Sequence, residues 1–148
     1  MKLLKLYQWI AGTSTDFCRP FQDNEALYNQ ARSFWAHVES QSIVFLIIFI
    51  VFGALLAWAY YMPFNEKPGR HYKPKYWAIF MVCTLLLVFA VTLGFEYFAA
   101  APKLKGALLL ETKIALANSL YATGVYVLIS WIWCQFNLPT NAYRLIKF

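Results

Sequence analysis

Three long stretches of this chain contain no charged side chain, and they constrain its fold more than any other feature. They run from Gln41 to Met62, from Tyr76 to Phe95 and from Ile114 to Tyr143. Each is at least as long as the roughly 20 residues that a helix needs to cross a bilayer core of about 30 Å. Hydrophobic residues make up 61% of the 148 residues and aromatic residues 20%, which is more than a soluble domain of this size can bury. The sequence therefore predicts an all-α integral membrane protein with three transmembrane helices.

The segments between these stretches are short, so we predict a single membrane domain over residues 1–148 without a separate soluble domain. Because the number of crossings is odd, the amino-terminal region and Pro102–Lys113 should lie on one side of the membrane, opposite Pro63–Lys75 and the carboxyl-terminal tail. The predicted elements are an interfacial helix at 1–12, an amphipathic helix continuing into the first span at 24–62, and further spans at 76–100 and 111–137.

Residues 1–12 have an amphipathic pattern. Apolar side chains recur at helical spacing on one side of this segment, whereas Lys2, Lys5 and Gln8 line the other. No apolar run here is long enough for a cleaved signal, so the segment is expected to be retained. We predict a short helix in the head-group layer; the alternative is a helix packed on a partner protein.

A second amphipathic segment precedes the first span. Asp23 or Asn24 can cap it, and apolar side chains follow at helical spacing. No Gly or Pro separates it from the span, so one helix is expected from about Asn24 to Met62, roughly 58 Å at 1.5 Å per residue. Such a helix either projects beyond the membrane or bends near Ser40–Ser42. Pro63 is expected to end the first span.

The third span has a polar face. At 100° per residue, small and polar side chains share an arc of about 140°, and leucines and other large apolar residues occupy the rest. The Asn118 amide is too polar to face hydrocarbon without a partner, so it must face protein or water. The candidate residues of this pore or packing face are Glu111, Asn118, Ser119, Thr123, Tyr126 and Ser130.

Two interpretations of this face remain open. It can pack against another helix, with small residues allowing close approach and Asn118 supplying a hydrogen bond. Alternatively, it can line a water-filled pathway formed by several copies of the chain around an axis. Gly53 and Ala57 form a second pair of small residues in the first span, where we predict close helix packing.

Glu96 lies near the end of the second predicted span. A carboxylate at this depth either reaches the interface or pairs with a cation, and Lys103 is a candidate partner for an intramembrane or interfacial ion pair. The three cysteines, Cys18, Cys83 and Cys134, are too scattered for a disulfide framework or a zinc site.

The charge balance favours a lipid partner. The chain has 13 Lys and Arg residues against 7 Asp and Glu residues, and most of the basic residues flank the apolar stretches. We therefore expect contact with the phospholipid bilayer and no binding of nucleic acid. Basic residues lie on both sides of the predicted spans, which leaves the orientation open. The expected location is a bacterial inner membrane or an organelle membrane.

The sequence lacks the motifs that membrane enzymes carry. It has no phosphate-binding loop, no paired His ligands and no nucleophile beside a base, so we predict no enzymatic activity and no cofactor or metal. The leading hypothesis is a membrane protein that self-assembles into an oligomeric channel or pore. The alternatives are an accessory or scaffold subunit of a larger membrane complex and an effector that permeabilises a membrane.

Overall fold

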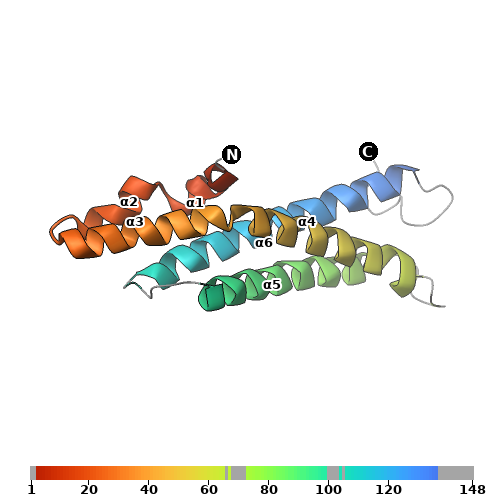
Figure 1. Cartoon of the computed structure of the whole chain (residues 1–148). Coiled ribbons are helices and arrows are strands. Elements are labelled where there is room, and N and C mark those ends of the chain that lie inside the picture. Colours follow the sequence, from red (N-terminus) through yellow and green to blue (C-terminus); the bar gives the residue numbers. More distant parts are fainter. Residues whose placement is uncertain (1–2, 66, 68–72, 100–103, 105, 137–148) are drawn as a thin grey trace. The chain divides into compact units, whose positions relative to one another are not determined.

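The computed structural model describes residues 3–65, 67, 73–99, 104 and 106–136 (Figure 1). These residues are mostly helical and include no strand, which confirms the all-α class. Short 3₁₀ turns form η1 and η2, and a π-helical turn forms η3. The elements in chain order are η1 (Leu3–Tyr7), α1 (Gln8–Ala11), α2 (Ser14–Cys18), η2 (Arg19–Phe21), α3 (Glu25–Ser40), α4 (Ser42–Ala59), η3 (Tyr60–Phe64), α5 (Pro74–Ala99) and α6 (Ala107–Phe136).

Within the described part of the chain, three helices are long and apolar enough to cross a membrane. They are Ser42–Phe64, Pro74–Ala99 and Ala107–Phe136. Helix α5 begins earlier than predicted because Pro74 suits the first position of a helix, where no N–H is needed. Helix α6 also begins earlier, directly after Gly106, whose φ of 96° sets the turn that precedes it.

Helix α3 begins where the sequence predicts. The Asn24 side-chain oxygen accepts hydrogen bonds from the backbone N–H groups of Ala26 and Leu27, at 3.1 and 3.3 Å. These bonds satisfy two of the donors that the first turn of a helix leaves without an intrahelical partner. The buried residues of this helix belong to the predicted apolar face and are Ala31, Phe34, Trp35 and Val38.

The single helix predicted from Asn24 to Met62 is interrupted at Gln41, within the region where a bend is one of the two predicted outcomes. On either side, the Ser40 hydroxyl donates to the carbonyl of His37 at 2.6 Å and the Ser42 hydroxyl donates to the carbonyl of Glu39 at 2.7 Å. Such bonds from a serine hydroxyl to a carbonyl of the same helix compete with the regular backbone hydrogen bonds. This competition favours an interruption of the helix at Gln41.

Helical structure continues past Pro63, which the sequence analysis expects to end the first span. Tyr60–Phe64 form a π-helical turn, and this wider turn leaves room for a proline ring that would clash with a carbonyl in a regular α-helix. The Asn65 side chain donates a hydrogen bond to the carbonyl of Tyr60. The Asn65 side chain therefore satisfies the carbonyl of Tyr60 at the end of the π-helical turn.

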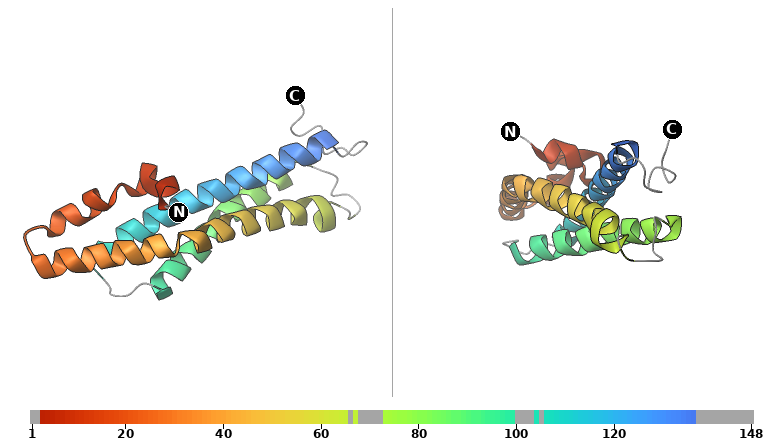
Figure 2. Two further views of the ribbon diagram at one scale, coloured as in Figure 1. Left: turned by 45° about the horizontal axis from the view of Figure 1, so that its top comes forward. Right: turned by 90° about the vertical axis from the view of Figure 1, so that its right-hand side faces the viewer.

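The chain divides into two compact units. The first unit comprises Met1–Ile47 and Phe89–Asn118. In this unit the amino-terminal segment folds back along α3 (Figure 2). The Phe17 ring contacts the rings of Phe34 and Trp35, with centroid separations of 5.8 and 5.9 Å.

The predicted helix at 1–12 appears as η1 and α1, and it ends at Gly12 with a φ of 82°. Helix α2 is an additional element. Its start is a reciprocal capping box in which the Thr13 hydroxyl accepts from the Asp16 N–H at 3.3 Å and the Asp16 carboxylate accepts from the Thr13 N–H at 3.0 Å.

The second unit comprises Ile48–Val88 and Ser119–Phe148. One buried cluster of this unit consists of Tyr60, Tyr61 and Cys134, and the Tyr61 hydroxyl lies 3.7 Å from the Cys134 sulfur. The rings of Tyr61 and Trp133 stack at a centroid separation of 5.4 Å. The partly buried side chains around the cluster are Phe64, Tyr76, Trp77, Phe80 and Trp133.

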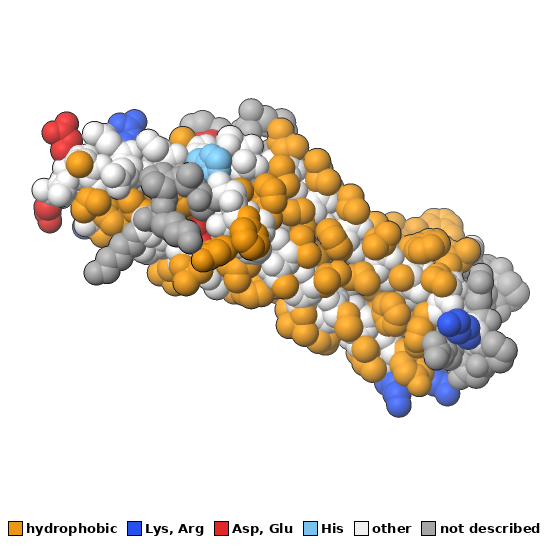
Figure 3. Space-filling view, turned by 60° about the horizontal axis from the view of Figure 1, so that its bottom comes forward, with side chains coloured by type: hydrophobic (Ala, Val, Ile, Leu, Met, Phe, Trp, Pro, Cys, Tyr) orange, Lys and Arg blue, Asp and Glu red, His pale blue; other side chains and the backbone are white. Residues whose placement is uncertain are grey.

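Large apolar side chains are exposed along all three long helices. They cover most of the face shown in Figure 3, where charged side chains are sparse. Such a surface suits hydrocarbon rather than water. The exposed apolar residues of these helices include Ile43, Ile47, Ile50, Val51, Leu55, Ile79, Val82, Leu86, Leu116, Leu120, Leu128 and Ile132.

Candidate functional site: the buried polar groups of the long helices

The polar face predicted on the third span lies almost entirely inside the protein. Thr123 alone among the six predicted residues is only half-buried. Glu111 and Asn118 belong to the first unit, and the others belong to the second unit. The buried members of the face are Glu111, Asn118, Ser119, Tyr126 and Ser130.

In the first unit, Asn118 is fully buried and joins three elements. Its side-chain oxygen accepts a hydrogen bond from the Tyr7 hydroxyl at 2.8 Å. Its side-chain nitrogen donates to the Thr92 hydroxyl, also at 2.8 Å. The amide of α6 therefore links η1 to α5, and neither end of it faces hydrocarbon.

In the second unit, the polar face of α6 binds α5 through Trp77. The Trp77 indole N–H donates to the Ser130 hydroxyl at 3.0 Å, and the Tyr126 hydroxyl donates to the Trp77 carbonyl at 3.1 Å. The Thr123 hydroxyl instead donates to the carbonyl of Ser119 on its own helix at 2.9 Å, which is a common arrangement for Thr in a membrane helix.

Gly53 lies where α4 meets α6 in the second unit. A Cβ atom placed on Gly53 would lie 2.7 Å from the carbonyl oxygen of Ala122 and 3.0 Å from the side chain of Val125. Ala57 is fully buried. Only a glycine allows the backbones to approach so closely at this position.

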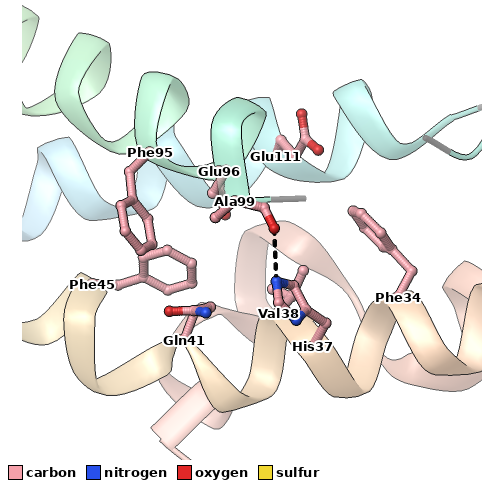
Figure 4. Close-up of a pocket in the computed structure, with 9 residues that line it drawn as sticks. All are labelled: Phe34, His37, Val38, Gln41, Phe45, Phe95, Glu96, Ala99 and Glu111. Atoms are coloured by element: carbon pink, nitrogen blue, oxygen red, sulfur yellow. Dashed lines mark hydrogen bonds between the residues drawn. The ribbon is translucent and has the colours of Figure 1, made fainter. Parts of the chain in front are cut away.

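Glu96 lies in the first unit, and only 4% of its surface is exposed. Neither of its carboxyl oxygens has a hydrogen-bond partner among the described residues. The predicted partner, Lys103, lies outside the described residues, so the ion pair stays a prediction. Glu96 borders a cavity of about 10 Å³ (Figure 4). We call this the Glu96 cavity; its lining residues are Phe34, His37, Val38, Gln41, Phe45, Phe95, Glu96, Ala99 and Glu111.

His37 connects α3 to the end of α5 beside this cavity. Its Nε2 atom lies 3.0 Å from the carbonyl oxygen of Ala99, as the dashed line in Figure 4 shows. Because a carbonyl only accepts, Nε2 carries the proton in this bond. Sequence reasoning did not single out His37, although its position beside the buried Val38 places it at the edge of the apolar face of α3.

A larger groove of about 550 Å³ lies in the first unit between the amino-terminal segment and the start of α6. Asp16 and Lys113 are its charged residues, and apolar side chains such as Ile10, Phe17 and Leu109 form much of the rest. Hydrogen bonds from the Thr13 side chain and backbone lower the pKa of the exposed Asp16 carboxyl. The lining of the groove therefore combines one carboxylate and one ammonium group with apolar side chains.

The chemistry available to these polar groups is hydrogen bonding and proton exchange. Within the described residues, no three His, Cys, Asp or Glu side chains are placed to hold a metal ion. Tyr7, His37 and Thr92 take part in these contacts in the first unit and Trp77 does so in the second, and sequence reasoning did not assign any of them to a site. Comparison with known protein families, curated proteins and solved structures finds no match.

Proposed function

We propose that the protein is a non-catalytic, multi-pass membrane component that serves as an accessory or scaffold subunit of a larger membrane complex. One observation carries this proposal: the polar face of α6 finds its hydrogen-bond partners within its own chain. Asn118 bonds to Tyr7 and Thr92, and Ser130 bonds to Trp77. The outward surfaces of the long helices are apolar and available to lipid or to the spans of a partner.

This arrangement disfavours a pore lined by α6, because opening the face to water would break these contacts. Each buried hydrogen bond contributes about 0.5–1.5 kcal/mol, and an unsatisfied partner costs about 1–3 kcal/mol. A face with several such bonds would therefore lose much of the stability that holds α6 to α5. Packing is the better supported of the two interpretations of the face.

A self-assembling channel is the second candidate, and Gly124 favours it. This glycine is exposed on α6, and a Cβ atom placed there would meet no atom within 4 Å. An exposed glycine on an apolar helix allows the helix of a second copy to approach closely. A membrane-permeabilising effector is a channel of this kind that opens only after a trigger.

The bilayer itself is the partner that the surface chemistry supports in either case. The exposed apolar side chains of the three long helices suit acyl chains, and the net charge of +6 suits anionic head groups. A bacterial inner membrane or an organelle membrane is the proposed location.

The size of the purified protein in mild detergent, together with its conductance in a planar bilayer, tests the two candidates. An accessory subunit should be a stable monomer and should carry no current. A discrete homo-oligomer with a steady or triggered current would overturn the accessory proposal in favour of the channel. Gly124→Leu should then dissociate the oligomer, whereas the matched control Leu120→Ala should leave it intact.

A further inference from the structure

We propose that the groove between the amino-terminal segment and the start of α6 binds one zwitterionic phospholipid with a primary-amine head group, with the ammonium at Asp16 and the phosphate at Lys113. We call it the amino-terminal groove. This inference rests on the membrane location in the proposed function, but it holds for an accessory subunit and for a channel alike. It adds one lipid at a defined position to the general contact of the apolar helices with a bilayer.

The amino-terminal groove has the size of a ligand site and lies within the first unit. Its volume of about 550 Å³ is within the range of roughly 300–1,000 Å³ that is common for ligand pockets. The Tyr7 hydroxyl donates to Asn118 and holds η1 against α6. The Phe17 ring packs on Phe34 and holds α2 against α3. The amino-terminal segment is therefore anchored at two points along the groove.

The Asp16 carboxylate is prepared to receive an ammonium group. The Thr13 hydroxyl and backbone N–H both donate to Oδ2 of Asp16, and these bonds hold the pKa of the carboxyl below its ordinary value of 3.8. The group is therefore ionised at neutral pH. A carboxylate has about four acceptor positions on its two oxygens, so Asp16 can accept a further hydrogen bond at Oδ1.

The Lys113 ammonium provides the complementary charge for a phosphate. Among the described cations, Arg19 rather than Lys113 is the one whose charge lowers the pKa of Asp16, and Arg19 is not part of the groove lining. The two charged groups of the groove therefore do not serve each other. Lys113 is half-buried in α6, and a lysine in such a position can bind a phosphate oxygen.

This pair of charges distinguishes between lipid head groups. An anionic phospholipid offers a phosphate to Lys113 but no cation to Asp16. A quaternary ammonium has no N–H group to donate to a carboxylate, whereas a primary ammonium has three. Hydrogen bonds between charged partners are stronger than neutral ones. A zwitterionic lipid with a primary amine therefore matches both charged groups of the groove.

The groove lies where head groups meet acyl chains when α6 crosses a bilayer. Helix α6 has 30 residues and is therefore about 45 Å long at 1.5 Å per residue, whereas the hydrocarbon core is about 30 Å thick. A centred helix extends about 7 Å beyond the core at each end, and Lys113 lies roughly 9 Å from Ala107 at the start of the helix. The flexible lysine side chain can reach the phosphates from this depth.

Apolar side chains of the groove are widely exposed. Trp9 and Leu109 both line it, and they are 62% and 64% exposed. Tryptophan favours the boundary between head groups and hydrocarbon, and burying a leucine against the methylene groups of an acyl chain is favourable. Exposed apolar side chains beside two opposite charges suit an amphiphile better than a polar solute.

Native mass spectrometry of the full chain in detergent tests the site, because it resolves each bound lipid by its mass. Phosphatidylethanolamine, phosphatidylcholine, phosphatidylglycerol and diacylglycerol with the same acyl chains are titrated separately. We expect one phosphatidylethanolamine to bind at the lowest concentration. Equal or tighter binding of any of the other three lipids would overturn the proposal.

Charge substitutions locate the site. Lys113→Gln and Asp16→Asn should each weaken the binding of phosphatidylethanolamine about tenfold, since each removes a charge-assisted hydrogen bond. The matched control Arg32→Gln removes an exposed charge of α3 outside the groove, and it should leave the affinity unchanged. Equal losses in Arg32→Gln and Lys113→Gln would show a general effect of charge and refute the site.

Two adjacent leucines test the apolar part of the groove. Leu108 and Leu109 are 60% and 64% exposed, and of the two only Leu109 lines the groove. Leu109→Gln should therefore weaken the binding of phosphatidylethanolamine, whereas Leu108→Gln should bind it as the wild type does. The same affinity in both variants would contradict the position of the lipid.

Flotation with phosphatidylethanolamine vesicles separates this site from the membrane location on which it rests. The wild type and Lys113→Gln should both float with the vesicles. A chain that does not float would refute the membrane location and the site with it. A chain that floats but binds the four lipids alike in detergent would refute the site alone.

Discussion

Asn118 shows how a single polar residue can join long apolar helices. Its amide is fully buried, and both of its ends are used, one by Tyr7 and the other by Thr92. In a helix that crosses a bilayer, no water is present to replace a lost hydrogen-bond partner.

Asn118→Leu should therefore weaken the first unit. The substitution leaves the Tyr7 and Thr92 hydroxyls without their amide partner, and we expect a loss of about 0.6–2 kcal/mol. Unfolding in mixed micelles would measure it. The matched control is Leu120→Ala, because 41% of Leu120 is exposed and a lipid-facing leucine contributes little. Equal effects of the two changes would contradict the structural role of Asn118.

Asp16 gives a prediction about pH. The Thr13 hydrogen bonds hold the pKa of Asp16 below its ordinary value of 3.8. A lowered pKa in the folded state means that the carboxylate stabilises α2 at pH values above 3.8, and this contribution disappears as the pH falls through the folded pKa.

Amide hydrogen exchange at the start of α2 should therefore accelerate at acidic pH in the wild type. In Asp16→Asn the side chain does not ionise, so exchange should lack this acid-dependent increase after correction for the intrinsic rate. The same acid dependence in both proteins would show that another group is responsible.

At the scale of the elements, the helices differ in how closely other atoms approach their glycines. Gly53 lies against the backbone of α6, whereas a Cβ atom on Gly94 would meet no atom within 4 Å. The two glycines occupy interior positions of long helices, so they form a matched pair for substitution. Their different surroundings predict opposite effects.

Gly53→Ala should destabilise the protein by about 1–3 kcal/mol, because the added methyl group collides with a backbone carbonyl that cannot rotate away. Gly94→Ala should stabilise it by up to about 1 kcal/mol, because alanine is the better helix former. Denaturation in mixed micelles would measure both. A neutral Gly53→Ala would mean that α4 and α6 are farther apart than in the structure.

At the scale of the whole molecule, the three helices predict a topology. Gln22 and Lys67 are exposed and lie on either side of the first candidate span. In a chain lacking the native cysteines, Gln22→Cys and Lys67→Cys should react with an impermeant reagent from opposite sides of the membrane. Reaction of both from the same side would rule out the three-span arrangement.

The amino-acid sequence by itself determined the all-α class and the three long apolar helices. It could do so because the length of an uncharged run and the cost of an unpaired backbone in lipid are local properties. The cap at Asn24 and the apolar face of α3 were predictable for the same reason. The sequence analysis did not predict the early starts of α5 and α6 or the π-helical turn at Pro63. These features depend on the backbone conformation of a few residues at the helix ends.

Only the tertiary structure decided which partners the polar residues find. Periodicity places Asn118 and Ser130 on one face of α6, but it does not say whether Tyr7, Thr92 or Trp77 will meet them, since these residues are distant in sequence. The Glu96 cavity likewise combines α3, α4, α5 and α6. A face is a property of one helix, whereas a hydrogen bond or a cavity depends on several helices packing together.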